Sequence, residues 1–235
     1  MDNVIKAPTR NRGIQMMVLS ATLVSTSGLI FRSFDNIDVF EIVFFRSLAL
    51  VSVMSFVIIW FYKYKSLEVV KAIGLWGVLG AAFFAGAQTA YGFAFSYTSV
   101  ANITFTIAVA PFLTAILAKL FLAESIPKST LIAMLFAAAG VCILFYSNVN
   151  FESFVGTLLA LTTACCFSCF AVILRKKREI DMLPVLLVTG LLTIPVGAGF
   201  GSWEESISLT DISLCVLWGA LLPVSYTHLT LPTKA

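Results

Sequence analysis

The segment GTLLALTTACCFSCFAVILR, residues 156–175, is a run of twenty residues whose only charge is the terminal Arg175. An α-helix rises about 1.5 Å per residue, so about twenty residues cross the hydrocarbon core of a bilayer. Three more cations follow at once, at Lys176, Lys177 and Arg178. An uncharged run of this length with a basic end predicts a membrane-spanning helix.

Apolar runs of similar length fill most of the rest of the chain. The predicted spans cover approximately 14–31, 40–61, 72–96, 99–122, 130–146, 154–174 and 183–200, and an eighth run, 212–224, then breaks off. Of the 235 residues 60% are apolar and 11% are charged, with a mean hydropathy of +0.99. Soluble domains are about 45–50% apolar and 25% charged, so soluble, disordered and disulfide-stapled classes are excluded. The fold class expected is an all-α membrane protein, a polytopic helical bundle.

Basic residues predict how these spans are oriented. If the N-terminus is cytoplasmic, eleven Lys and Arg residues fall on the cytoplasmic side, whereas the outer loops hold only Arg32. Positive residues concentrate on the cytoplasmic side of membrane proteins. We therefore expect a multi-pass protein of the inner (plasma) membrane with a cytoplasmic N-terminus. The eleven residues are Lys6, Arg10, Arg12, Lys63, Lys65, Lys71, Lys128, Arg175, Lys176, Lys177 and Arg178.

The chain contains an internal repeat at a shift of 143 residues. Gly13–Arg32 falls on Gly156–Arg175, and, after a one-residue slip, Leu75-Trp76-Gly77 falls on Leu217-Trp218-Gly219. The first unit holds five spans, an odd number, so its copy must enter the membrane in the opposite sense. Inverted repeats of this kind are a device of secondary transporters. Chance similarity among apolar helices is the alternative.

The repeat predicts the organisation of the chain. We expect a cytoplasmic N-terminus (1–13), a first repeat with spans 1–5 (14–146), a partial second repeat with spans 6–8 (154–224) and an anomalous tail (225–235). The tail is polar and threonine-rich where more helix is due. A ten-helix fold of inverted five-helix repeats, truncated to about seven and a half spans by an artefactual end, is therefore expected.

Several motifs resemble the EamA-like family of the drug/metabolite transporter (DMT) superfamily. They are Phe44-Phe45-Arg46 early in the second span; Ala101-Asn102, Pro111-Phe112, Glu124 and Ile126 along the fourth; Ala139-Gly140-Val141 in the fifth; and Gly156 to the Arg175–Arg178 cluster in the sixth. The resemblance covers about 13–222. It implies ten helices in two inverted five-helix units, and it makes the export of amino acids or related metabolites the leading expectation.

Arg46 is the sharpest candidate for contact with a substrate. It lies about six residues into the second predicted span, and charged groups within a membrane tend to face a cavity or a partner helix. One interpretation is an anion-attracting group at the outer end of a central cavity. The other is a side chain that reaches the outer interface, with Asp38 or Glu41 as its partner.

Five further residues complete the candidate site. Gln88 and Tyr91 are three apart and share one face of the third span, and Asn102 and Thr106 are four apart on the fourth. Each could bind substrate, or could instead make an interhelical hydrogen bond. Pro111 removes a backbone donor in the middle of the fourth span, which allows a bend suited to gating.

Catalytic and metal chemistry have no good candidates in the sequence. Cys165-Cys166-x-x-Cys169 lies in an apolar run and lacks the four ligands of a tetrahedral site, so packing is the expected role. The only histidine, His228, lies in the tail, and all twelve acids lie at span ends or in loops. We expect no cofactor, no metal and no enzyme activity, and coupling to protons is unsupported.

The function expected is transport of small polar metabolites by alternating access. A passive channel or a non-transporting membrane scaffold is the alternative, and an intramembrane enzyme is a more distant one. The partners expected are membrane lipid and a small-molecule substrate, with a homodimer as a further option. Nucleic acid is not expected as a partner, because the net charge is only +3.

Overall fold

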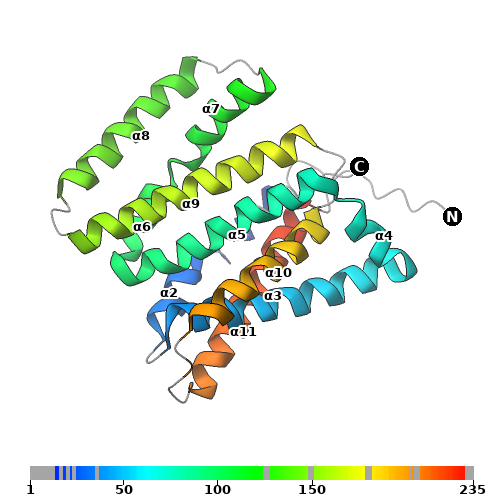
Figure 1. Ribbon diagram of the computed structural model, residues 1–235. Helices are drawn as coiled ribbons and strands as arrows, with labels where there is room; N and C mark the ends of the chain where they lie inside the picture. The colour runs from blue at the N-terminus through cyan, green and yellow to red at the C-terminus, as the bar shows by residue number, and fades with distance from the viewer. Residues whose placement is uncertain are drawn as a thin grey trace. The chain divides into compact units, whose positions relative to one another are not determined.

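The structure is a computed structural model that describes residues 14–15, 18–19, 22, 25–34, 37–123, 128–147, 151–177, 182–201, 203 and 207–230. Every regular element in these ranges is a helix (Figure 1). The predicted N-terminal segment 1–13, Glu124, Ile126, Arg178 and residues 231–235 lie outside the described residues.

Long apolar helices lie where the sequence predicts spans, which confirms the all-α membrane bundle. The second to seventh predicted spans agree with helices to within about three residues at each end, and the first is described in part, ending in α2 (Ser27–Arg32). Five stretches in the described ranges are long and apolar enough to cross a membrane. The other helices of these spans are α3 (Val39–Tyr62), α5 (Gly74–Tyr97), α6 (Val100–Ile107), α7 (Ala110–Leu122), α8 (Lys128–Ser147), α9 (Phe151–Lys176) and α10 (Met182–Phe200).

The fourth span has a two-residue break in its regular α-helical structure. Helix α6 ends at Ile107 and α7 begins at Ala110, with Pro111 in its first turn. Because proline has no backbone N–H and its fixed φ suits the first turn of a helix, the chain starts a new helix there. The break lies at residues 108–109, just before Pro111, and both residues keep right-handed helical dihedral angles.

The eighth apolar run forms a longer helix than the sequence predicts. Helix α11 covers Leu209–Thr230, whereas the apolar run was expected to end at residue 224. The polar residues 225–230 include no proline or glycine, and the next proline is Pro232. Helix propagation costs little once a helix has begun, so polarity alone does not end α11.

The chain folds into two compact units. Unit 1 comprises Met1–Leu67 and Met182–Ala235, and unit 2 comprises Glu68–Asp181. The first boundary falls in α4 (Ser66–Lys71), which follows the short 3₁₀ helix η1 (Lys63–Lys65). Unit 1 therefore contains the first, second, seventh and eighth spans, and unit 2 contains the third to the sixth. Each compact unit combines helices from both of the predicted sequence repeats.

In unit 1, α3 packs against both α10 and α11. Glycines allow the close approach: a Cβ on Gly197 would lie 2.7 Å from the carbonyl oxygen of Phe40, and one on Gly190 would lie 2.6 Å from a methyl group of Val51. Small residues let helix backbones approach in membranes, where packing takes the place of the hydrophobic driving force. These contacts hold α3 between its two partners.

In unit 2, α5 packs along most of α9, and α6 and α7 pack on α9 as well (Figure 1). Phe84 and Phe170 stack with ring centroids 4.5 Å apart. A Cβ on Gly156 would lie 2.6 Å from the Cβ of Thr98. Glycine is therefore required where α9 passes the turn between α5 and α6.

Candidate functional site

Arg46 lies on α3 in unit 1 and is buried, with 3% of its surface exposed. Its guanidinium carbon lies 4.7 Å from the centroid of the Trp218 ring on α11. This placement differs from a side chain that extends to an exposed interface. A cation on an aromatic face is stabilised by about 2 kcal/mol or more when both groups are desolvated, which offsets part of the cost of burying the charge.

Trp218 is itself enclosed, with 2% of its surface exposed. The rings of Phe31 and Phe34, at the end of α2, lie 6.2 and 6.5 Å from its ring centroid. The next residue, Gly219, faces the backbone carbonyl of Arg46, and a Cβ there would collide with that oxygen and with Ala49. Two consecutive residues of α11 thus contact the side chain and the backbone of Arg46.

Two acids in unit 1 are buried although both lie in the first turn of a helix. Glu41 is the third residue of α3, and Asp211 is the third residue of α11. Both carboxylates and Arg46 lie within electrostatic range of the buried Cys215 thiol. Both acids were expected at span ends, but their burial was not predicted from the sequence. The spacing of Asp211, Cys215 and Trp218, at i, i+4 and i+7, was a signal for one shared helix face.

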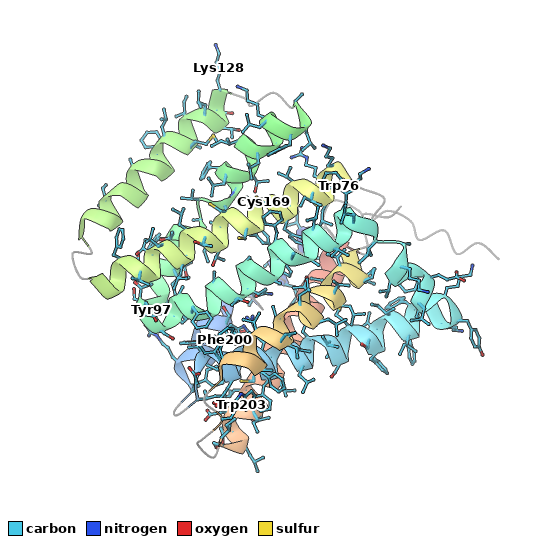
Figure 2. All side chains as sticks on the ribbon, viewed as in Figure 1. Trp76, Tyr97, Lys128, Cys169, Phe200 and Trp203 are labelled. Carbon is cyan, nitrogen blue, oxygen red and sulfur yellow. The ribbon has the colours of Figure 1, made fainter. Side chains whose placement is uncertain are left out.

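Glu41 joins the start of α3 to the segment after α10. One carboxylate oxygen accepts a hydrogen bond from the backbone N–H of Asp38 at 3.2 Å, and the other accepts one from the backbone N–H of Trp203 at 3.1 Å. The Trp203 ring meets Phe44 edge to face at 5.1 Å. Figure 2 marks Trp203 and Phe200 at this end of unit 1. The Glu41 side chain therefore connects the first turn of α3 to residue 203 within unit 1.

Gln88 and Tyr91 lie on α5 in unit 2, where Gln88 is buried and Tyr91 half-buried. The Tyr91 ring meets Phe95 edge to face at 4.9 Å. That the two side chains share one face of α5 stays a prediction from their spacing.

Asn102 makes a polar contact between distant segments of unit 2. Its side-chain amide donates to the hydroxyl oxygens of Thr98 at 2.8 Å and Thr157 at 2.7 Å. Asn102 is 5% exposed, and its side-chain carbonyl oxygen has no hydrogen-bond partner among the described residues. The oxygen and nitrogen positions of the amide are assigned from its hydrogen bonds. With either assignment, the two threonine hydroxyls pair with only one of the two amide atoms. The other end remains able to bind a polar ligand group or water.

Thr106 and Pro111 occupy the broken fourth span. The Thr106 hydroxyl donates to the carbonyl of Asn102 at 2.8 Å, within its own helix. Near Pro111, the Ser168 hydroxyl of α9 donates to the carbonyl of Ala110 at 2.9 Å. The break is thus attached to α9 by a side chain that the sequence analysis did not single out.

The six predicted residues divide between the two units. Arg46 belongs to unit 1, and Gln88, Tyr91, Asn102, Thr106 and Pro111 belong to unit 2. Within unit 2 the structure brings Asn102 to Thr157, which was not predicted. Cys165, Cys166 and Cys169 carry free thiols, and no three metal-binding side chains converge within the described part of the chain.

Comparisons with known proteins add a family and a fold. Residues 11–146 match the model of the EamA-like transporter family. A crystal structure of another protein, 17% identical in sequence, aligns with 96% of this chain and 80% of that one, with a TM-score of 0.72. At this identity the likeness shows the fold alone. No curated protein matches the chain.

Proposed function

The chain belongs to the EamA-like transporter family of the DMT superfamily, and from this premise we propose that it exports amino acids or related small polar metabolites by alternating access. As a member of that family with several membrane-spanning helices, it is a multi-pass membrane transporter. The substrate class, the direction of transport and the mechanism are the parts that we propose.

The buried Arg46 is the observation that carries the proposal. A charge within membrane-spanning helices is costly, and such residues mark substrate pathways or counter-ions by default. Arg46 lies eight residues into α3, contacts Trp218 and shares its surroundings with two buried carboxylates. A guanidinium binds carboxylates through paired N–H donors, while carboxylates attract an ammonium group. A zwitterionic amino acid carries both of these complementary groups.

Within unit 2, buried hydrogen-bonding groups are separate candidates for contact with a polar substrate. Gln88 and Asn102 are buried amides, and one end of the Asn102 amide has no partner among the described residues. Pro111 and the break before it would serve as the gate, because residues 108–109 lie outside both helices of the span.

Two tryptophan contacts support the inverted repeat. Trp76 in the first repeat and Trp218 in the second are matched by the sequence shift. Lys176, at the end of α9, lies 5.6 Å from the centroid of the Trp76 ring. Phe31 in α2 and Phe34 just after it flank Trp218. Trp76 and Trp218 match after a one-residue slip, and the repeat shift of 143 residues carries Lys176 to position 33, between those two phenylalanines. We propose from this agreement that each tryptophan packs on the first span of the opposite repeat. We also propose that the protein lies in the inner membrane and that its N-terminus is cytoplasmic.

Flux measurements in proteoliposomes test the proposal. Radiolabelled amino acids should enter or leave vesicles with saturation, and unlabelled substrate on the opposite side should accelerate exchange. A passive channel would show no saturation in the same concentration range, and a scaffold would show no flux.

Variants of Arg46 locate the site. Arg46→Ala should abolish saturable flux, and Arg46→Lys should retain part of it. Arg32→Ala, at an exposed arginine of the same unit, is the matched control and should leave flux unchanged. Full activity of Arg46→Ala would remove Arg46 from the site.

A further inference from the structure

Helix α11 contacts Arg46 at two adjacent positions. The Trp218 ring lies under the guanidinium, with 4.7 Å between the ring centroid and the guanidinium carbon. Gly219 lies so close to the backbone carbonyl oxygen of Arg46 that a side chain at position 219 would collide with it. One dipeptide of α11 therefore sets both how close α3 comes and where its charged group lies.

A ring beneath a guanidinium restrains it in a particular way. The cation–π contact engages the face of the planar group, whereas the N–H donors of arginine lie in its plane and form a rigid fork. Trp218 can thus fix the orientation of Arg46 without taking up the donors that bind a carboxylate. Arginine has a long side chain with large rotamer entropy. A restraint that exists before the substrate binds therefore lowers the entropy that Arg46 loses on binding.

Trp218 is held in place from its other sides. Phe31 in α2 and Phe34 just after it pack on the indole. Trp218 is one of the largest fully enclosed side chains among the described residues. The matched tryptophan of the first repeat differs. Trp76 is 43% exposed, and its cation is an exposed lysine, Lys176. Of the two matched tryptophans, only Trp218 is both fully enclosed and in contact with an arginine.

We propose that Trp218 and Gly219 are positioning residues for Arg46, and that they set its selectivity for a substrate carboxylate. Trp218 orients the guanidinium fork, and Gly219 fixes the approach of α3 to α11. The inference rests on the proposed function, in which Arg46 binds the carboxylate of the substrate.

The test compares amino acids with their carboxamides, in which the carboxylate is replaced by a neutral group. The probe is the radiolabelled amino acid that the wild-type protein transports best in proteoliposomes, together with its carboxamide. We expect Trp218→Leu to raise KM for the amino acid roughly tenfold or more, with Vmax within about twofold and the carboxamide nearly unaffected. The preference for the amino acid over the carboxamide should therefore fall. Trp76→Leu is the matched control and should leave both substrates unchanged.

Trp218→Phe keeps an aromatic face and covers the case in which Trp218→Leu fails to fold. This variant should retain most of the preference for the carboxylate, with a KM increase of a few fold. A purely structural role would reduce Vmax for both substrates alike and leave their ratio unchanged. An unchanged ratio in both variants overturns the inference.

A fluorescence measurement checks the contact without any substrate. The chain has four tryptophans, and replacing Trp60, Trp76 and Trp203 with Phe leaves Trp218 as the only emitter. Arg46→Met in that background should change the Trp218 emission, and Arg32→Met should not. Unchanged emission in Arg46→Met overturns the proposed contact.

The combined outcomes separate this inference from the proposed function. Loss of transport in Arg46→Ala together with normal KM and selectivity in the Trp218 variants overturns the positioning role and leaves the function intact. Normal transport in Arg46→Ala overturns the binding role of Arg46, and the positioning role with it.

Discussion

The two units differ in the kind of polar group that they bury. The buried charged residues of the described ranges, Glu41, Arg46 and Asp211, all belong to unit 1. The buried polar side chains described in unit 2 are neutral, and Asn102 and Ser168 use theirs to join α6 and α7 to α9. Neutral groups hold one unit together, whereas charges concentrate in the other. A charge costs far more than an amide to bury, so unit 1 carries the stronger indication of function.

The matched tryptophans give the first and largest test of this difference. Trp218→Ala should lower the free energy of unfolding by about 3–5 kcal/mol, because a large enclosed side chain leaves a cavity. Trp76→Ala should cost less than this, because 43% of the Trp76 surface is already exposed. Unfolding in detergent micelles, followed by circular dichroism, measures both. Equal losses would show that the two contacts are alike.

Close-approach glycines offer a second test in each unit. Gly219→Ala in unit 1 and Gly156→Ala in unit 2 should each cost about 1–3 kcal/mol, because the new Cβ would meet backbone atoms that cannot move aside easily. Gly199→Ala is the control, since a Cβ there meets nothing within 4 Å. It should change stability by less than about 0.5 kcal/mol. A Gly219→Ala protein as stable as the control would contradict the packing of α11 on α3.

Double-mutant cycles sharpen the comparison of polar contacts. For Asn102→Ala with Thr157→Val we expect a coupling energy of about 1–1.7 kcal/mol, near the upper end for membrane proteins. For Ser47→Ala with Thr193→Val we expect about 0.6 kcal/mol or less. The Thr193 hydroxyl lies 2.7 Å from Ser47 but also within reach of the carbonyls of Thr189 and Gly190, so it keeps an acceptor when Ser47 is removed. The reverse order of couplings would contradict this account.

The smallest effect is expected where α9 holds the broken span of unit 2. Ser168→Ala removes one hydroxyl contact to the Ala110 carbonyl and should cost about 0.6 kcal/mol. Thr162→Val, which removes only a local bond to Leu158 on an exposed position, is the matched control. Thermal unfolding of both variants measures the difference. A larger loss in the control would mean that the break is not held by Ser168.

The spans were predictable because length and hydropathy alone determine them. The helix expected at 40–61 is found at Val39–Tyr62, and the break near Pro111 follows from the missing N–H of proline. The end of α11 was not predicted, because a polar composition suggests a loop even when no residue stops the helix. Family membership followed from motifs that the first repeat carries in full.

Much of the candidate site could not be predicted from the sequence, because it depends on contacts between distant segments. Glu41 and Asp211 look like interfacial acids near the start of a span, and only the packing of α3 on α10 and α11 shows them to be buried. The contact between Asn102 and Thr157 joins residues 55 positions apart. The contacts of Trp218 with Phe31, Phe34 and Arg46 likewise join segments that are far apart in the sequence.

The division of the chain also has a consequence for biosynthesis. Unit 2 is one continuous segment that interrupts unit 1, so the ribosome completes it before α10 and α11 emerge. Arg46 is made 172 residues before Trp218, which at ordinary elongation rates is a delay on the order of 10–30 s. During that interval α3 is in the nascent chain without the helix that later covers its charge. The insertion machinery or a local water defect must shelter one arginine until translation is nearly complete.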